Sequence, residues 1–227
     1  MPAPASAGGP PSVRTAFVSG ARLAGWVERF GASHRGYRMQ DDDDGLRLVA
    51  ADGAEALLQA PWPADGRPGR GDGPLERLAA LASQPRTLGR LLVRRGGYGV
   101  GVAREGLLLA AKAGTRYVQS RTAAGGQSQQ RFARRRSNQA DVLVAAVAEQ
   151  AGMVFAGHAF EYLVPGGDRT LADLVLEEPA LRNYALLPRL AYLDVHEPRA
   201  AVLKKAAADA CSVRITVTDP AGSRTWP

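Results

Sequence analysis

Short apolar runs alternate with turn residues at the start of the chain's second half. Between residues 88 and 112, three such runs are separated by Arg-Arg-Gly-Gly and Arg-Glu-Gly. Apolar runs of this length, bounded by glycine and charged residues, are typical of consecutive β-strands. The pattern predicts a β-meander with strands at Leu88–Val93, Tyr98–Ala103 and Leu107–Lys112, and Thr115–Ser120 is a candidate for a fourth strand.

After the meander the apolar spacing becomes helical. Apolar residues from Val142 to Val147 recur on one helix face, Ser137 or Asn138 is placed to cap the helix, and Gly152 is placed to end it. The pattern then predicts a strand within Met153–Val164, a turn at Pro165–Asp168, a helix capped by Thr170, a short helix near Pro179–Leu187, a strand at Leu190–Val195, a helix at Glu197–Ala210 and a closing strand at Val213–Thr218.

The N-terminal part shows both patterns over shorter stretches. Apolar positions from Phe17 to Phe30 predict a helix with Ser19 as its N-cap and Gly31 as its stop. The remainder is predicted as strands at Leu46–Ala50 and Ala54–Ala60, a loop at Pro61–Pro74 and a short helix opened by Pro74. The consecutive aspartates Asp41–Asp44 are predicted to form a solvated acidic loop.

Alternation of strands and helices favours a layered architecture. We predict an α/β (α+β) fold with a mixed β-sheet that contains the meander and has helices packed on it. The predicted divisions are a disordered leader at residues 1–12, an N-terminal α+β part at 13–85, a main domain at 86–220 and a flexible tail at 221–227. The leader lacks the basic and apolar segments of a secretory signal, and no run is long enough to span a membrane.

Positive charge is concentrated in one segment. The net charge is +7 and the pI about 10.1. Between Glu105 and Asp141 there is no acidic residue, and this acid-free block holds seven basic ones: Lys112, Arg116, Arg121, Arg131, Arg134, Arg135 and Arg136. Because such a block repels itself unless a polyanion is nearby, it predicts binding to a phosphate backbone. A merely solvated basic loop is the alternative.

The segment Thr-Ala-Ala-Gly-Gly-Gln-Ser-Gln-Gln, residues 122–130, lies inside this block. Gly125 and Gly126 disfavour regular structure and let the backbone approach another molecule closely. Gln127, Gln129 and Gln130 add uncharged amide donors and acceptors. Arginines that bind phosphates, placed around such amides in a predicted loop at Arg121–Arg136, suit recognition of an RNA end.

Gly125-Gly126-Gln127 is the tripeptide that class I translation release factors insert into the ribosomal peptidyl-transferase centre. Its surroundings resemble the release-factor-like domain of the eukaryotic ribosome quality-control peptidyl-tRNA hydrolases (the Vms-type and ankyrin/zinc-finger proteins) and their actinobacterial relatives. The resemblance rests on Gly96-Gly97-Tyr98 and the strand pair after it, on Lys112–Tyr117, and on Arg131–Arg136 followed by Asn138. It covers about Leu88 to Thr218 and implies a fold similar to the catalytic middle domain of eukaryotic and archaeal class I release factors, with a small N-terminal α+β extension.

The resemblance implies a peptidyl-tRNA hydrolase that cleaves the ester between nascent peptide and tRNA on stalled large ribosomal subunits. Gln127, Gly125 and Gly126 would be its catalytic residues, and the seven basic residues would bind ribosomal RNA or tRNA. It implies no cofactor, no metal and no membrane, and a monomer in the cytoplasm. The eukaryotic loop reads Gly-x-x-Gln, but here Ala124 replaces its glycine; Gly126–Gln129 also fits that pattern, so Gln129 is the alternative catalytic glutamine.

Hydrolysis of the ester needs a positioned water and stabilisation of the oxyanion. A glutamine amide is a poor base at neutral pH, so its side chain would orient the water while the backbone N–H of Gln127 donates to the oxyanion or leaving group. A role for the backbone N–H explains why two glycines precede Gln127 better than a mechanism that uses the side chain alone.

Other functions have weaker sequence support. A non-catalytic ribosome- or RNA-binding module would keep the basic loop without its chemistry, and a ribonuclease-H-like nuclease would need clustered carboxylates, which the acid-free block lacks. The glycines from Gly96 to Gly101 lack the Lys-Ser/Thr of a phosphate loop and predict a meander turn.

His158 and His196 are expected at core or boundary positions. Cys211 is the sole cysteine, which favours a reducing, cytosolic setting.

Overall fold

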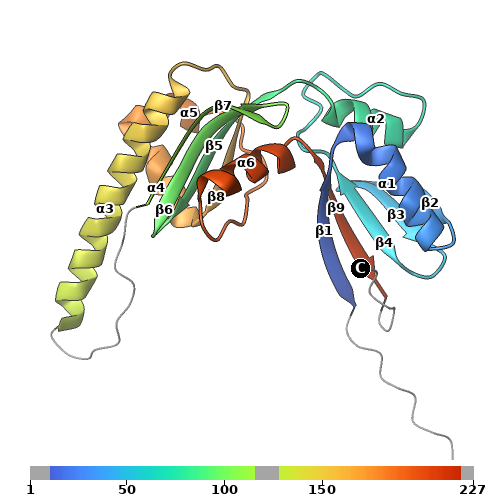
Figure 1. Cartoon of the computed structure of the whole chain (residues 1–227), viewed down its shortest axis with the longest axis horizontal. Coiled ribbons are helices and arrows are strands. Elements are labelled where there is room, and N and C mark those ends of the chain that lie inside the picture. Colours follow the sequence, from blue (N-terminus) through green and yellow to red (C-terminus); the bar gives the residue numbers. More distant parts are fainter. Residues whose placement is uncertain (1–10, 116–127, 221–227) are drawn as a thin grey trace, which may run out of the picture. The chain divides into compact units, whose positions relative to one another are not determined.

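The computed structural model describes residues 11–115 and 128–220, and for residues 128–139 it describes the backbone helix alone (Figure 1). The chain folds into two compact units. The N-terminal unit combines residues Met1–Gln84 with Cys211–Pro227, and the central unit comprises Pro85–Ala210. No helix among the described residues has the length and apolar character needed to cross a bilayer.

The N-terminal unit is an antiparallel sheet with helices on one face. Among the described residues its strand order is β1-β9-β4-β3-β2. Leu23, Val27 and Phe30 of the first helix pack on alternate residues of the strands. The elements are β1 (Ser12–Val18), α1 (Gly20–Ser33), β2 (Tyr37–Asp42), β3 (Gly45–Ala50), β4 (Glu55–Gln59), α2 (Pro74–Ala82) and β9 (Val213–Asp219).

Strand β9 joins the N-terminal sheet rather than the central one. The division expected from the sequence places it at the end of the main domain, 86–220. It pairs antiparallel with β1 from Ser12↔Asp219 to Val18↔Val213 and with β4 on its other side. Its alternating residues Val213, Ile215 and Val217 are buried in the core under α1. Long-range pairing of this kind leaves no local signal in the sequence.

Helix α1 corrects two details of the prediction. It starts at Gly20, with Ser19 in the N-cap position, but the Ser19 hydroxyl makes no capping hydrogen bond within the described residues. The helix also continues through Gly31 to Ser33. A Cβ on Gly31 would lie 2.8 Å from the ring of Tyr37, so this glycine makes room for an aromatic ring instead of ending the helix.

The four aspartates form part of a hairpin and not a loop alone. Asp41 and Asp42 end β2, and β3 begins at Gly45. The Asp42 carboxylate accepts hydrogen bonds from the Asp44 backbone N–H at 3.0 Å and from Arg47 Nε at 2.7 Å. These two donors lower the pKa of Asp42 below its ordinary value. The acidic run is therefore the turn of a β-hairpin whose charge is partly neutralised by Arg47.

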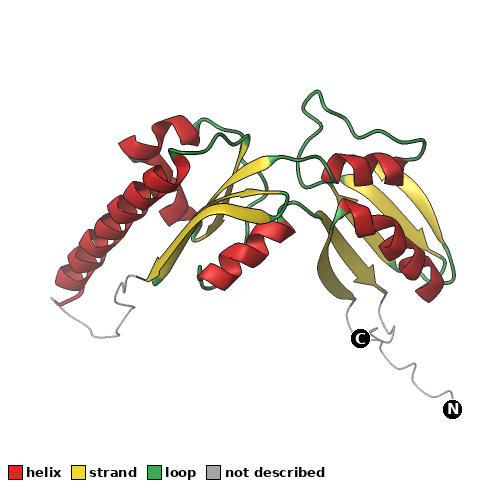
Figure 2. Ribbon diagram, turned by 45° about the horizontal axis from the view of Figure 1, so that its top comes forward, coloured by secondary structure: helices red, strands yellow, loops and turns green. Residues whose placement is uncertain are grey.

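The central unit contains the predicted meander in a mixed sheet, and the predicted α+β fold class is confirmed. Strands β5 (Thr87–Arg94), β6 (Gly97–Arg104) and β7 (Leu107–Thr115) pair antiparallel, and β8 (Tyr162–Gly167) pairs parallel with β5. Figure 2 shows helices on both sides of this sheet. They are α3 (Ser128–Phe155), α4 (Arg169–Glu177), η1 (Pro179–Leu181), α5 (Arg182–Ala185) and α6 (Ala200–Asp209).

Two apolar clusters bury the two faces of the central sheet. On one face Leu91, Val93, Val100 and Val102 pack on α3 and α4, where Phe155 and Phe160 make an edge-to-face ring contact with centroids 4.9 Å apart. On the other face Leu92 packs with Val195 and with Leu203 and Ala206 of α6. Because both faces are covered, β5 and β6 are buried at nearly every position, as expected of strands that are covered on both sides.

Helix α3 is longer than predicted at both ends. It begins at Ser128, about ten residues before the predicted cap at Ser137 or Asn138, and it passes Gly152 to end at Phe155. Glutamine, arginine and alanine are good helix formers, and they make up most of the segment after Ser128. The Met153–Phe155 part of the predicted strand is consequently helical, and β8 starts only at Tyr162.

The segment Leu190–Val195, predicted as a strand, forms no continuous strand in the part of the chain that the structure describes. It lies along β8 through isolated parallel bridges, Leu163↔Arg189 and Gly166↔Leu193. Leu193 donates its N–H to the Pro165 carbonyl at 3.0 Å. Because Pro165 has no N–H to donate, a regular ladder cannot form beside it.

The N-cap of α4 is Asp168, and the prediction of Thr170 is wrong. The Asp168 carboxylate accepts a hydrogen bond from the Leu171 backbone N–H at 3.2 Å. We expect Asp168→Ala to lower the free energy of unfolding by about 1 kcal/mol, the usual effect of removing an N-cap. Thr170→Ala is the matched control and should leave stability unchanged. Chemical denaturation followed by far-UV circular dichroism compares the two, and equal effects would contradict the assignment of the cap.

Candidate functional site

The predicted catalytic loop is held between two elements of the central unit. Strand β7 ends at Thr115 and helix α3 begins at Ser128. The predicted catalytic residues Gly125, Gly126 and Gln127, and the basic residues Arg116 and Arg121, lie outside the described residues. What the structure describes is therefore the support of the loop: the strand that enters it and the helix that leaves it.

The end of β7 is packed tightly against β6. A Cβ on Gly114 would lie 2.7 Å from the ring of Tyr98, and a Cβ on Gly97 would lie 2.8 Å from the carbonyl oxygen of Gly114. Tyr98 itself is 7% exposed. Only glycine fits at these crossings, so the two strands hold Thr115 in a defined place where the chain enters the predicted loop.

The other predicted site residues divide between α3 and β7. Gln129 and Arg131, Arg134, Arg135 and Arg136 belong to the first turns of α3, although the sequence predicts a loop there. Figure 1 shows these first turns extending past the sheet. Lys112 lies on β7 opposite Val100 and is exposed. The basic residues are thus carried by a strand and a helix at the two sides of the predicted loop.

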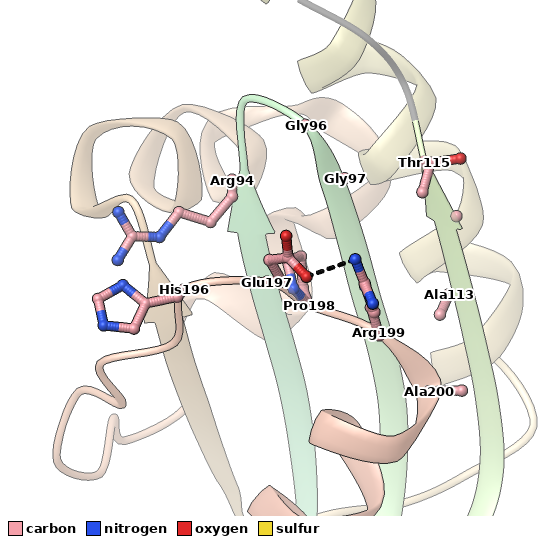
Figure 3. Close-up of a pocket in the computed structure, with 11 residues that line it drawn as sticks. Arg94, Gly96, Gly97, Ala113, Thr115, His196, Glu197, Pro198, Arg199 and Ala200 are labelled. Atoms are coloured by element: carbon pink, nitrogen blue, oxygen red, sulfur yellow. Dashed lines mark ion pairs between the residues drawn. The ribbon is translucent and has the colours of Figure 1, made fainter.

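A pocket opens beside Thr115. Its volume is about 660 Å³. Figure 3 shows it at the end of the central sheet, where the β5–β6 turn, the end of β7 and the segment that leads into α6 meet. Its lining residues are Arg94, Gly96, Gly97, Ala113, Gly114, Thr115, His196, Glu197, Pro198, Arg199 and Ala200.

Three nitrogen-bearing side chains line this pocket. Arg94 donates from Nε to the Val195 carbonyl at 2.6 Å and from Nη2 to the Asp194 carboxylate at 3.1 Å, which ties the end of β5 to the approach to α6. Arg199 pairs with Glu197 at 2.7 Å, and both side chains are largely exposed. His196 is also exposed. Such exposed pairs contribute little to stability, so Arg199 is available to an anion.

Sequence reasoning does not single out Arg94 or Arg199, and it places His196 at a core or boundary position. Local patterns could not reveal these residues, because Arg94 and Arg199 are about a hundred residues apart in the sequence and line one pocket only in the folded unit. The hydrogen bonds from Arg94 to Val195 and Asp194 hold the two segments together. The glycines from Gly96 to Gly101 are, as predicted, the turn and strand of the meander. Their lack of side chains also leaves space for the pocket.

No group of three or more His, Cys, Asp or Glu residues within the described segments is arranged to hold a metal ion. The side chains of His158 and Cys211 are both half-buried.

Comparison with solved structures found partial similarity to two archaeal chains. One is described as an archaeal protein, with 14% identity and a TM-score of 0.27 over 70% of this chain and 48% of the other. The second is Pelota from Archaeoglobus fulgidus, with 13% identity and a TM-score of 0.28 over 88% of this chain and 63% of that one. This chain thus spans about half of the first structure and less than two thirds of the second. The search of curated proteins found no match.

Comparison with protein families matched residues 86–216, which is more than half of the chain, to the family described as the Actinobacteria/chloroflexi VLRF1 release factor. The matched interval runs from the start of the central unit into β9. It agrees with the resemblance inferred from the sequence over Leu88–Thr218, and that prediction is confirmed. The chain belongs to the Actinobacteria/chloroflexi VLRF1 release factor family.

Proposed function

We propose that this chain hydrolyses peptidyl-tRNA on stalled large ribosomal subunits through the Gly125-Gly126-Gln127 tripeptide. The observation that carries the proposal is the position of this tripeptide inside the interval 86–216 that matches a release-factor family. The strand that enters the segment and the helix that leaves it are both anchored in the central sheet. A loop held in this way can be presented to a partner without reorganising the domain.

The proposed reaction is addition of water to an ester. A water molecule attacks the carbonyl carbon, the bond to the ribose oxygen of the tRNA breaks, and the products are the peptide carboxylic acid and a free 3′-terminal hydroxyl. The Gln127 side chain orients the water, and its backbone N–H donates to the developing oxyanion or leaving oxygen. Gly125 and Gly126 allow the main chain to come close enough for this contact.

The basic residues supply the partner surface. Arg131 and Arg135 stand one helical turn apart in α3, and like charges at this spacing destabilise an isolated helix by a few tenths of a kcal/mol. RNA phosphates offset this repulsion. Their binding to the arginines also releases counterions from the RNA, which contributes to the affinity. We assign the binding of ribosomal RNA or tRNA to Lys112, Arg116, Arg121, Arg131, Arg134, Arg135 and Arg136. The partner is the peptidyl-transferase centre with its peptidyl-tRNA, and the protein acts as a monomer in the cytoplasm.

Replacing the catalytic glutamine tests the proposal directly. On stalled large-subunit nascent-chain complexes, Gln127→Ala should slow peptide release by about 100-fold, because the attacking water loses its orientation. Gln129→Ala is the matched comparison two residues away and should release at close to the wild-type rate. The disappearance of peptidyl-tRNA on a denaturing gel measures the rate, and co-sedimentation with the subunits measures binding.

Each outcome of this experiment has a distinct meaning. If the wild-type protein leaves peptidyl-tRNA intact while co-sedimenting with the subunits, the chain is a binding module and the proposal is wrong. A loss confined to Gln129→Ala would transfer the catalytic role to Gln129. Free peptidyl-tRNA should be a poor substrate, because the ribosome supplies much of the proposed site.

The proposed hydrolysis uses no metal ion of the protein. We therefore expect the wild-type release rate to be unchanged when the protein is pre-treated with EDTA, desalted and added to complexes in their normal magnesium buffer. A nuclease would instead lose activity with its bound metal and would shorten the RNA. Shortened tRNA or rRNA on the same gel would contradict ester hydrolysis.

A further inference from the structure

The pocket beside Thr115 has a use that the ester-hydrolysis chemistry does not require. Among the described residues that line it, Arg94, His196 and Arg199 give the pocket its chemical character. It nevertheless adjoins the residue at which the chain enters the predicted catalytic loop. A ligand bound there would lie beside Thr115, the last described residue before the predicted catalytic loop.

The volume and the lining of the pocket leave room for a small organic ligand. Gly96, Gly97, Ala113 and Gly114 form a wall of small residues that includes exposed backbone. A Cβ placed on Gly96 would meet no atom of the described residues within 4 Å, so the space above this turn is open. A volume of about 660 Å³ lies in the range of sites that hold small organic ligands.

The cationic groups of the pocket can exchange their partners for an anion. Arg94 pairs with Asp194 at 3.1 Å and Arg199 pairs with Glu197 at 2.7 Å, and both carboxylates are largely exposed. Exposed ion pairs are weak, so a phosphate can replace Glu197 as the partner of Arg199. The exposed imidazole of His196 can stack on a base or donate to a phosphate. Figure 3 shows Arg94 and His196 extending to the same side, with the Glu197–Arg199 pair in front of the glycine turn. Cationic groups beside a small-residue wall are the combination that an RNA nucleotide needs.

We propose that this pocket binds one unpaired RNA nucleotide, with its phosphate at Arg199 and its base against the wall formed by Gly96, Gly97 and Ala113. The acid-free block that follows Thr115 makes RNA a better match than an acidic peptide, because it can bind the neighbouring phosphates of the same strand. The assignment of the RNA to the 3′ end of the tRNA or to ribosomal RNA rests on the proposed function. The proposal that the pocket binds a nucleotide is independent of it.

A titration of the ¹⁵N-labelled full chain tests the binding. The probe is the 5′-phosphorylated RNA trinucleotide CCA, and inorganic phosphate is the parallel arm. We expect the trinucleotide to shift the amide resonances of Gly96, Gly97, Gly114 and Ala200. Arg199→Ala should weaken this binding about tenfold, the effect of losing a hydrogen bond between charged groups. Arg104→Ala, an exposed arginine at the far end of β6, is the matched control and should bind as wild type.

A second variant blocks the pocket without removing a charge. Gly96→Leu places a side chain in open space, so the unit should keep its fold, as its unchanged spectrum elsewhere would show. We expect Gly96→Leu to abolish the shifts caused by the trinucleotide. Equal shifts with inorganic phosphate alone would overturn the assignment of a nucleotide in favour of a simple anion site. Wild-type affinity in Gly96→Leu, or no shift at these amides, would also overturn it.

Crosslinking on stalled subunits identifies the source of the nucleotide. A benzophenone amino acid introduced at Arg95, which is exposed in the turn next to Gly96, should crosslink to RNA upon irradiation. A product of tRNA size assigns the pocket to the acceptor end, and a product of ribosomal RNA size assigns it to the subunit. No RNA adduct would overturn the proposal. A wild-type protein that fails to release peptide but still binds the trinucleotide would refute the proposed function alone.

Discussion

The pairing of β5 with β6 is the interaction on which the central unit depends. These strands are in register from Thr87↔Arg104 to Arg94↔Gly97 and are buried on both faces. Burial on both faces requires cover on both sides, which α3 and α4 provide on one and α6 on the other. The turn that connects these two strands lies beside the pocket, and β7 pairs with β6 up to Thr115. The buried β5–β6 pair therefore fixes the position of Thr115, where the chain enters the predicted loop.

Glycines in β6 allow this arrangement. A Cβ on Gly99 would lie 3.3 Å from the Pro198 carbonyl oxygen, and one on Gly101 would lie 3.4 Å from Leu203 of α6. Their absence of side chains lets the segment before α6, and α6 itself, rest close to the sheet. A spacing of glycines that superficially resembles a phosphate-binding loop is thus a packing feature. Its consequence for function is indirect, since it brings Arg199 and His196 to the edge that Arg94 occupies.

Local patterns in the sequence predict the elements well where they are strictly alternating or bounded by turns. The first two meander strands, the β3–β4 hairpin and the helix opened by Pro74 are confirmed within a residue or two. The third meander strand is confirmed at its start, but it runs three residues past the predicted end at Lys112, to Thr115. Pairing between distant strands is not predictable, because Val213–Asp219 has the same pattern whichever sheet it joins. Glycine is the least reliable stop: Gly31 and Gly152 lie inside helices, where packing decides their role. The same limit applies to Arg94 and Arg199, whose proximity depends on the fold alone.

The two proposed sites differ in how far apart their residues lie in the sequence. The proposed catalytic tripeptide consists of three consecutive residues, so the amino-acid sequence alone is enough to propose it. A pocket for a nucleotide needs cations from separate elements, and here Arg94 holds the segment before α6 through Val195 and Asp194 while remaining part of the wall. Arg94 thus has two roles: its hydrogen bonds hold the segment before α6 in place, and its side chain forms part of the pocket wall. For the proposed binding of a nucleotide this coupling has a consequence, because helix α6 cannot shift without moving the pocket wall.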